Sequence, residues 1–193
     1  MKKNIIIAGV PRAGKSTAAH MLAKATGYPH ISMDAVIAGF EAVFPNLGVH
    51  TDQGLSSMET FVKISGLIAP FMNAMMESDE YDKFHQGMIL DVYQLLPKDY
   101  AALMNPDMCD VYYLGTADVT AQQRLDLLLA YDTPQEYTYE MPLAEKRENC
   151  ANMVEQSRMI RRECRRLGFP YYETSFQREE TLNRLVGDIL RTL

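Results

Sequence analysis

Residues 9–17 of the chain read GVPRAGKST and match the pattern G-x-x-x-x-G-K-[ST] in full. In this pattern a glycine-rich loop wraps its backbone N–H groups around phosphate. The apolar run Ile5 to Ala8 precedes the loop, and a helix-compatible run, Ser16 to Ala25, follows it. Because the motif works only between a buried strand and the N-terminus of a helix, this context predicts a site for a nucleoside triphosphate.

Each part of the loop has an expected task. Glycines at positions 9 and 14 permit the tight turn and a close approach of backbone to phosphate. Lys15 would reach the β- and γ-phosphates, the Ser16 hydroxyl would ligate magnesium, and Thr17 would contact the α-phosphate. Arg12 at the crest either contacts phosphate or is solvated. The residues predicted to bind the nucleotide are Gly9, Pro11, Arg12, Ala13, Gly14, Lys15, Ser16 and Thr17.

Length and composition suit one globular domain, residues 1–193. The net charge of −6 and the pI near 5.2 argue against a nucleic-acid partner held on a broad basic surface. The three cysteines, Cys109, Cys150 and Cys164, have no metal-like spacing and are expected to be reduced thiols. No apolar run reaches the length of a membrane span or resembles a signal peptide. We expect a cytoplasmic monomer or homodimer without a membrane partner.

Apolar runs alternate with longer helical patterns, which predicts an α/β fold with a parallel sheet. Helical spacing of apolar residues predicts helices at 55–76 and 143–167 and a last helix near the C-terminus. Pro70 is expected to kink or split the first of these. The expected strands are 4–8, 28–32, 88–92, 111–114 and 170–173. The helical region at about 40–84 is expected to cap a substrate, and the segment at about 130–150 is expected to form a lid.

Two aspartates stand where predicted strands end. Asp91 ends the apolar run before it, so it would hold magnesium beside the phosphate loop, or alternatively cap a helix. Asp34 follows the second predicted strand and would face the γ-phosphate, where a carboxylate can accept a proton from an acceptor hydroxyl. The alternative for Asp34 is the N-cap of a helix that begins at residue 35.

Arginines are frequent in the second half of the chain, and most of them should lie on a solvated face of the helix at 143–167. Phosphoryl transfer nevertheless needs cations that neutralise charge on the transferring group. The candidates for this task are Arg124, Arg158 and Arg162. The four histidines show no metal spacing and are expected to be structural or exposed.

The chain resembles the nucleoside and nucleotide kinase-like branch of the P-loop NTPases. The matching segments are GVPRAGKST, the strand-end aspartate in HISMD, the Walker-B-like MILDVY, the strand and helix CDVYYLGTADVTAQQRL, and PYYETS before the last helix. This resemblance implies three layers, α/β/α, around a five-stranded parallel sheet of order 2-3-1-4-5, with a lid after the fourth strand. It also implies ATP and Mg²⁺ as cofactors.

Three departures bear on the acceptor. Adenylate-kinase-like enzymes have a second arginine four residues after Arg124, where this chain has Leu128. The arginine-rich lid is replaced by YDTPQEYTYEMP, residues 131–142, and no D-G-x-P signature follows Asp91. The placement of Asp34 looks more like that in shikimate, gluconate and chloramphenicol phosphotransferases.

Two functions follow from these patterns. The first is a kinase that moves the γ-phosphoryl group of Mg-ATP to a hydroxyl or phosphate acceptor on a metabolite or nucleotide, with Lys15, Asp34 and the arginines as catalytic groups. The second is a regulatory or partner-binding ATPase with slow turnover, which the missing lid arginines favour. A signalling GTPase is disfavoured because the chain has no N-K-x-D motif.

Overall fold

Five parallel strands form one sheet, and their order across it is β2-β3-β1-β4-β5. The computed structural model describes residues 3–49, 58–78 and 87–193. The strands are β1 (Asn4–Gly9), β2 (His30–Ser32), β3 (Ile89–Val92), β4 (Cys109–Gly115) and β5 (Tyr171–Glu173). Both the predicted α/β class and the predicted strand order are confirmed.

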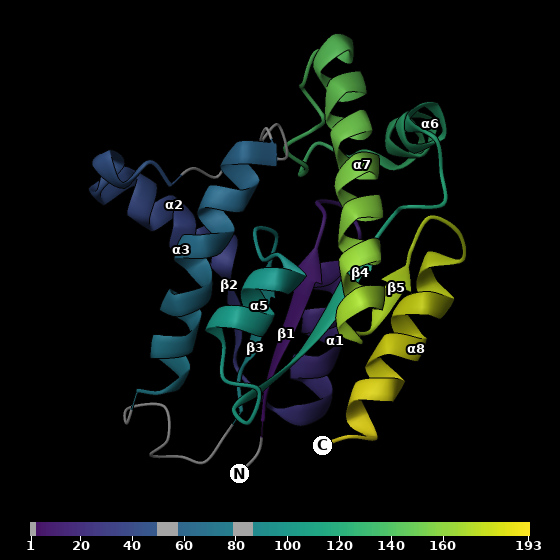
Figure 1. Cartoon of the computed structure of the whole chain (residues 1–193). Helices are drawn as coiled ribbons and strands as arrows, with labels where there is room; N and C mark the ends of the chain where they lie inside the picture. The colour runs from purple at the N-terminus through teal and green to yellow at the C-terminus, as the bar shows by residue number, and fades with distance from the viewer. Residues whose placement is uncertain (1–2, 50–57, 79–86) are drawn as a thin grey trace.

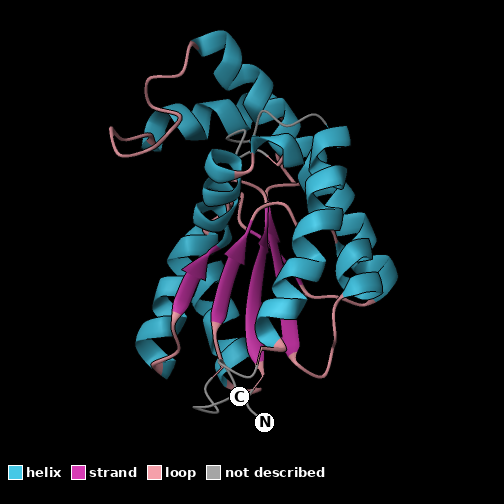
Figure 2. Cartoon of the chain, turned by 90° about the vertical axis from the view of Figure 1, so that its left-hand side faces the viewer, coloured by secondary structure: helices cyan, strands magenta, loops and turns pink. Residues whose placement is uncertain are grey.

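The helices lie on both sides of this sheet (Figure 2). They are α1 (Lys15–Thr26), α2 (Met33–Val43), α3 (Met58–Met76), α5 (Pro97–Leu103), α6 (Ala121–Tyr131), α7 (Leu143–Leu167) and α8 (Arg178–Leu190), with a short 3-10 helix, η1 (Pro45–Leu47). On one side α1 packs against β1, β3 and α8, and on the other α7 packs against β4 and α5. The result is a three-layer α/β/α arrangement (Figure 1).

The middle strand forms the centre of the core. Ile5, Ile6 and Ile7 of β1 are at most 1 % exposed, since β1 pairs with β3 on one side and β4 on the other. Burial of each such side chain contributes about 1.5–3 kcal/mol. A parallel strand covered on both faces reads as a continuous apolar run, which is why the sequence predicted it well.

Several helix boundaries follow local signals. Helix α6 begins with a capping box in which the Thr120 hydroxyl accepts from the backbone of Gln123 and the Gln123 side chain accepts from the backbone of Thr120. Helix α7 ends at Leu167, before Gly168, as predicted. Helix α3 continues through Pro70 as one element, so Pro70 does not split this helix, and the alternative that it kinks the helix stays a prediction. The predicted start of this helix, at residues 55–57, lies outside the described residues.

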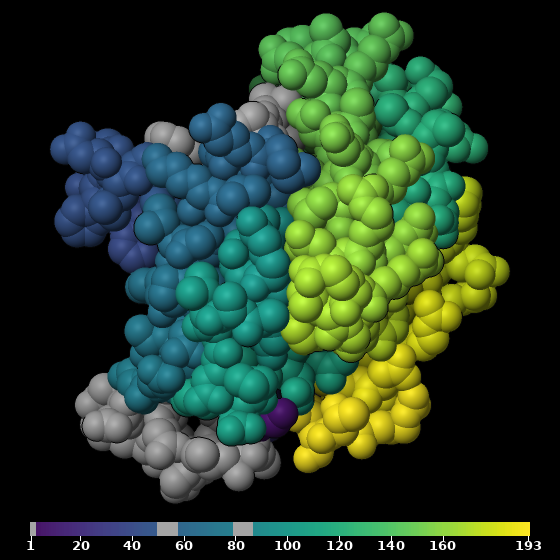
Figure 3. All heavy atoms as spheres, in the orientation of Figure 1, coloured from purple at the N-terminus to yellow at the C-terminus, as the bar shows by residue number. Residues whose placement is uncertain are grey.

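The carboxyl ends of the strands point away from the C-terminus of the chain (Figure 2). At that end, α2 projects from the body of the protein, as the space-filling view shows (Figure 3). In the part of the chain that the structure describes, no helix has the length and apolar character needed to cross a membrane.

Candidate functional site

The loop between β1 and α1 has the backbone conformation that a phosphate cradle requires. Gly9 and Gly14 both have positive φ, 133° and 102°. A Cβ at Gly9 would stand 1.9 Å from the carbonyl oxygen of Leu114, and a Cβ at Gly14 would stand 3.1 Å from Leu182. Only glycine fits at position 9, because both its φ and its neighbours exclude a side chain. Gly14, the last residue of this loop, is the N-cap of α1, so the loop leads directly into the N-terminus of that helix.

Lys15 lies at the centre of this site. Its Nζ donates to the carbonyl oxygen of Val10 at 3.1 Å and lies 5.9 Å from the centroid of the Tyr93 ring. Burial lowers the pKa of Lys15, and the negative charges of Asp34 and Asp91 oppose this shift. The lysine is thus a buried ammonium near two carboxylates, suited to anionic oxygen.

Asp34 and Asp91 reach this site from helix α2 and strand β3. Asp91 lies within β3, opposite Ile7 of β1, so it is a strand residue and the alternative of a helix cap is wrong. Asp34 lies in the first turn of α2, whose N-cap is Ser32, so the N-cap alternative is wrong for Asp34 as well. Burial raises the pKa of Asp34, and Lys15 partly reverses the shift.

Asp91 has a partner that the sequence pattern did not identify. His30 Nε2 lies 3.0 Å from Asp91 Oδ2, because His30 stands on β2, the neighbour of β3. Histidines without metal spacing are expected to be structural or exposed, and His30 is partly exposed while its ring contacts Asp91.

Three arginines surround the phosphate loop. Arg124 of α6 is 7 % exposed, its Nε has no hydrogen-bond partner among the described residues, and its terminal nitrogen contacts the Met153 sulfur at 3.8 Å. Burial lowers the pKa of Arg124, and the charges of Arg12 and Arg178 lower it further. The Nε of Arg178 would be 3.3 Å from a Cβ at Gly14. Arg12, Arg124 and Arg178 act electrostatically on one another and form a cationic cluster at the phosphate loop.

Arg178 is not among the site residues predicted from the sequence. One signal was present: Arg178 is the first residue of the helix that follows the last strand, and ligands of open α/β sheets lie at the carboxyl ends of strands. Helix α8 packs on α1, and this packing brings Arg178 to the loop.

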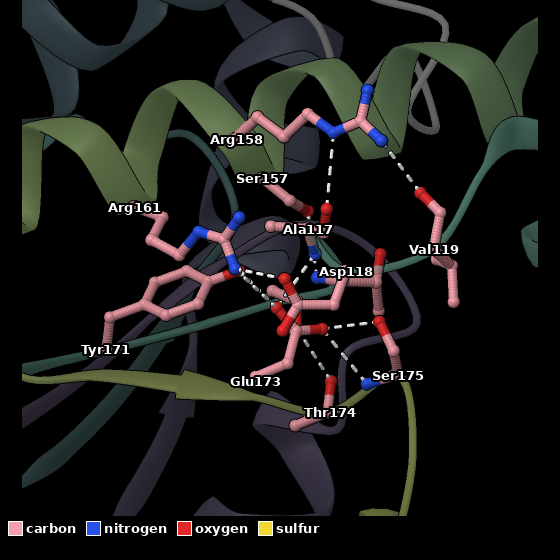
Figure 4. Close-up of polar contacts among 12 residues, drawn as sticks. Ala117, Asp118, Val119, Ser157, Arg158, Arg161, Tyr171, Glu173, Thr174 and Ser175 are labelled. Carbon is pink, nitrogen blue, oxygen red and sulfur yellow. Dashed lines mark hydrogen bonds and ion pairs between the residues drawn. The ribbon is translucent and has the colours of Figure 1, made fainter.

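Arg158, a predicted cation of the transfer step, contacts backbone carbonyls of the loop after β4. Its Nε donates to the carbonyl of Ala117 at 3.2 Å, and its terminal nitrogen donates to the carbonyl of Val119 at 3.0 Å (Figure 4). Arg162 on the same helix is exposed. The structure therefore brings Arg124 to the loop, while Arg158 supports the connection between β4 and α6.

Glu173 holds the ends of β4 and β5 together. Its carboxylate accepts from the backbone N–H of Ala117 at 2.9 Å and of Ser175 at 3.2 Å, and from the Ser175 hydroxyl (Figure 4). The guanidinium of Arg161 lies 3.6 Å from the same carboxylate and also pairs with Asp118. The loops that flank the expected nucleotide are thereby fixed to each other.

The segment 132–142, part of the predicted lid, contacts the phosphate loop. Arg12 pairs with Asp132 at 3.5 Å and with Glu136. Asp132 in turn accepts from the Thr138 hydroxyl at 2.6 Å and pairs with Lys146 at 3.2 Å. The sequence allowed two alternatives for Arg12, contact with phosphate or solvation. In this structure its guanidinium pairs with two carboxylates instead.

The residues present fit a magnesium nucleotide. Ser16 and Thr17 are exposed at the start of α1, and Arg124 carries a buried donor that a phosphate oxygen can satisfy. Within the described residues, no group of three or more His, Cys, Asp or Glu side chains could hold a metal ion. Magnesium bound with a nucleotide requires only one or two carboxylates, besides phosphate and water oxygens.

Comparison with solved structures identifies the same architecture in known kinases. A shikimate kinase from Bacteroides thetaiotaomicron is 12 % identical, with 98 % of each chain covered and a TM-score of 0.59. A gluconokinase from Sinorhizobium meliloti 1021 is 14 % identical, with 98 % of this chain and 97 % of that chain covered and a TM-score of 0.52. A shikimate kinase from Acinetobacter baumannii, solved in complex with shikimate, is 16 % identical, with 98 % and 92 % covered and a TM-score of 0.54.

A scan of protein-family models and a search of curated proteins gave no match. The structural likeness shows the fold: the chain has the same architecture as these shikimate kinase and gluconokinase structures. The predicted resemblance is confirmed at this level.

Proposed function

We propose that the protein is an ATP-dependent kinase that transfers the γ-phosphoryl group of Mg-ATP to a hydroxyl or phosphate group on a small metabolite or nucleotide. The observation that carries the proposal is that Asp34, in the first turn of α2 directly after β2, shares a charged site with Lys15, the buried first residue of α1. Binding of nucleotide uses the phosphate loop and Lys15 and does not need Asp34. The carboxylate of Asp34 beside Lys15 therefore supports transfer to an acceptor.

In this proposal Lys15 binds the β- and γ-phosphates and Arg124 neutralises charge that develops on the transferring group. Ser16 and Asp91 would hold magnesium, which when bound supplies neutralisation of phosphate charge. Asp34 accepts the proton of an acceptor hydroxyl at its carboxylate oxygen, and its raised pKa makes it a stronger base than an ordinary aspartate. When the acceptor is bound as well as the nucleotide, the segment 131–141 excludes water, which otherwise competes as acceptor.

The test is phosphoryl transfer by the purified protein to a library of hydroxylated metabolites and nucleotides in the presence of Mg-ATP, with products detected by mass spectrometry. We expect one chemical class of phosphorylated product. The Asp34→Asn variant should lose turnover by about 100-fold or more, the usual contribution of a general base, and keep its affinity for ATP. Failure to phosphorylate any acceptor would contradict the proposal.

A second candidate is a regulatory ATPase with slow turnover, and the pairing of Arg12 with Asp132 and Glu136 favours it, since the lid segment presents carboxylates to the phosphate loop. Hydrolysis of ATP unchanged by Asp34→Asn, together with a stable protein partner, would support this candidate over the kinase.

A further inference from the structure

Arg12 occupies a special position in the phosphate loop. It is one of two non-glycine residues with positive φ among the described residues, at 61°, a conformation that costs about 1 kcal/mol or more for such a residue. Its side chain is 16 % exposed and points toward the segment 132–142, where it pairs with Asp132 and Glu136. The guanidinium is thus held at the loop by two carboxylates from a segment about 120 residues away.

The two carboxylates differ in their surroundings. Asp132 has a side chain that is 4 % exposed and is held by Lys146 and Thr138, so it forms the centre of the folded segment. Lys146 also donates to the carbonyl of Tyr139 at 3.0 Å. The side chain of Glu136 is 42 % exposed, and its described ion pair is with Arg12. Glu136 can therefore release Arg12 without disturbing the buried contacts of Asp132.

A bound nucleotide would bring phosphate oxygens to the same loop. Charge-assisted bonds from arginine to phosphate are strong and often bidentate, and a guanidinium has a limited number of donors. The negative charges of Asp132 and Glu136 also oppose the entry of another anion. Phosphate and the two carboxylates therefore compete for one cation.

We propose that residues 132–142 form a latch on the donor site: Asp132 and Glu136 hold Arg12 when no nucleotide is bound, and the phosphates of the nucleotide take Arg12 over and release the segment. This inference rests on the proposed binding of nucleotide at Lys15 and adds regulation of that site. By linkage, a contact that nucleotide breaks must itself lower the affinity for nucleotide. Glu136 acts through Arg12 and is a positioning residue.

The experiment measures the dissociation constant of Mg-ATP by calorimetry for the wild type, Glu136→Gln, Arg12→Gln and the double variant. We expect Glu136→Gln to bind about 5- to 10-fold more tightly, at the low end of allosteric couplings. The gain should be lost in the Arg12→Gln background, because a residue that acts through Arg12 has no effect without it. Glu140→Gln is the matched control, since Glu140 is exposed in the same segment and the substitution removes the same charge.

Hydrogen exchange supplies a second readout. Mg-ATP should speed backbone amide exchange in 132–142 of the wild type, and Glu136→Gln should show the faster exchange before nucleotide is added. Protection of this segment by Mg-ATP would overturn the latch and show closure over the nucleotide instead. Weaker binding by Glu136→Gln, or an equal gain in the Arg12→Gln background or in Glu140→Gln, would also overturn it.

The two proposals fail in different ways. A wild type that binds no Mg-ATP overturns the proposed function and the latch together. A wild type that binds Mg-ATP with an affinity unchanged by Glu136→Gln overturns the latch alone.

Discussion

At the scale of single residues, Arg124 brings a buried charge and an unsatisfied donor to the site. Its Nε is buried without a hydrogen-bond partner among the described residues, and the two charged groups that most affect it within the cluster, Arg12 and Arg178, are cations. Burial of an unpaired donor costs about 1–3 kcal/mol, and more for a charged group. A bound anion that accepts from Arg124 would offset this cost.

Arg124→Met should therefore separate stability from binding. We expect the free energy of unfolding without nucleotide to stay equal or rise, because methionine fills a similar space without the buried charge. Affinity for Mg-ATP should fall by about 10-fold, as for loss of one charge-assisted bond. Arg165→Met is the control, since Arg165 is exposed on α7. A large loss of stability in Arg124→Met would identify a structural cation.

The raised pKa of Asp34 predicts how the stability of the protein depends on pH. Its pKa is higher in the folded protein than in the unfolded chain, so its contribution to stability is fully present at acidic pH and is lost as pH rises through the folded pKa. Asp34→Asn removes this loss. The melting temperature of Asp34→Asn relative to the wild type should therefore rise as the pH increases above the ordinary aspartate pKa of about 3.9, which differential scanning calorimetry at several pH values can measure. A constant difference would contradict the raised pKa.

At the scale of elements, strands and long helices could be predicted from the sequence because their signals are local. The apolar run of β1 and the spacing along α7 each span enough residues to be read alone. Helix α5 was not predicted, since seven residues are too few for periodicity, although Pro97 at its start and Asp99 in its first turn are typical start signals. The role of Arg158 depends on how α7 packs on β4, which no local pattern contains.

The hydrogen bonds of Glu173 connect the loops that follow β4 and β5. Glu173→Gln removes the charge that accepts from the backbone of Ala117 and Ser175, and we expect it to lower the free energy of unfolding by about 1–2 kcal/mol. Asp118→Asn is the matched control: Asp118 pairs with the same Arg161, but its side chain is 51 % exposed, so its loss should cost less than about 0.5 kcal/mol. Equal costs in urea denaturation would contradict a special role for Glu173.

At the scale of the whole molecule, the distribution of charge matters more than its sum. The net charge of −6 argued against a nucleic-acid partner, yet Arg12, Arg124 and Arg178 gather at the phosphate loop from three distant parts of the chain. Composition gives the net charge but cannot indicate the arginine cluster, because the cluster forms only when the chain folds and α6 and α8 come close to the loop. The phosphate loop itself was predictable because all its residues are contiguous.

This cluster predicts a local effect of Arg178 on nucleotide binding. Arg178→Gln should weaken Mg-ATP binding by about 3- to 10-fold and reduce the dependence of affinity on salt, because charges beyond a Debye length of about 8 Å at physiological ionic strength are largely screened. Arg184→Gln on the same helix removes the same charge, but Arg184 lies over the Tyr172 ring, with 5.8 Å between its guanidinium carbon and the ring centroid. Calorimetric titrations with Mg-ATP at low and physiological salt compare the affinities of these two variants. If both variants lose affinity equally, the field of the whole molecule governs binding, and Arg178 has no contact with the phosphates.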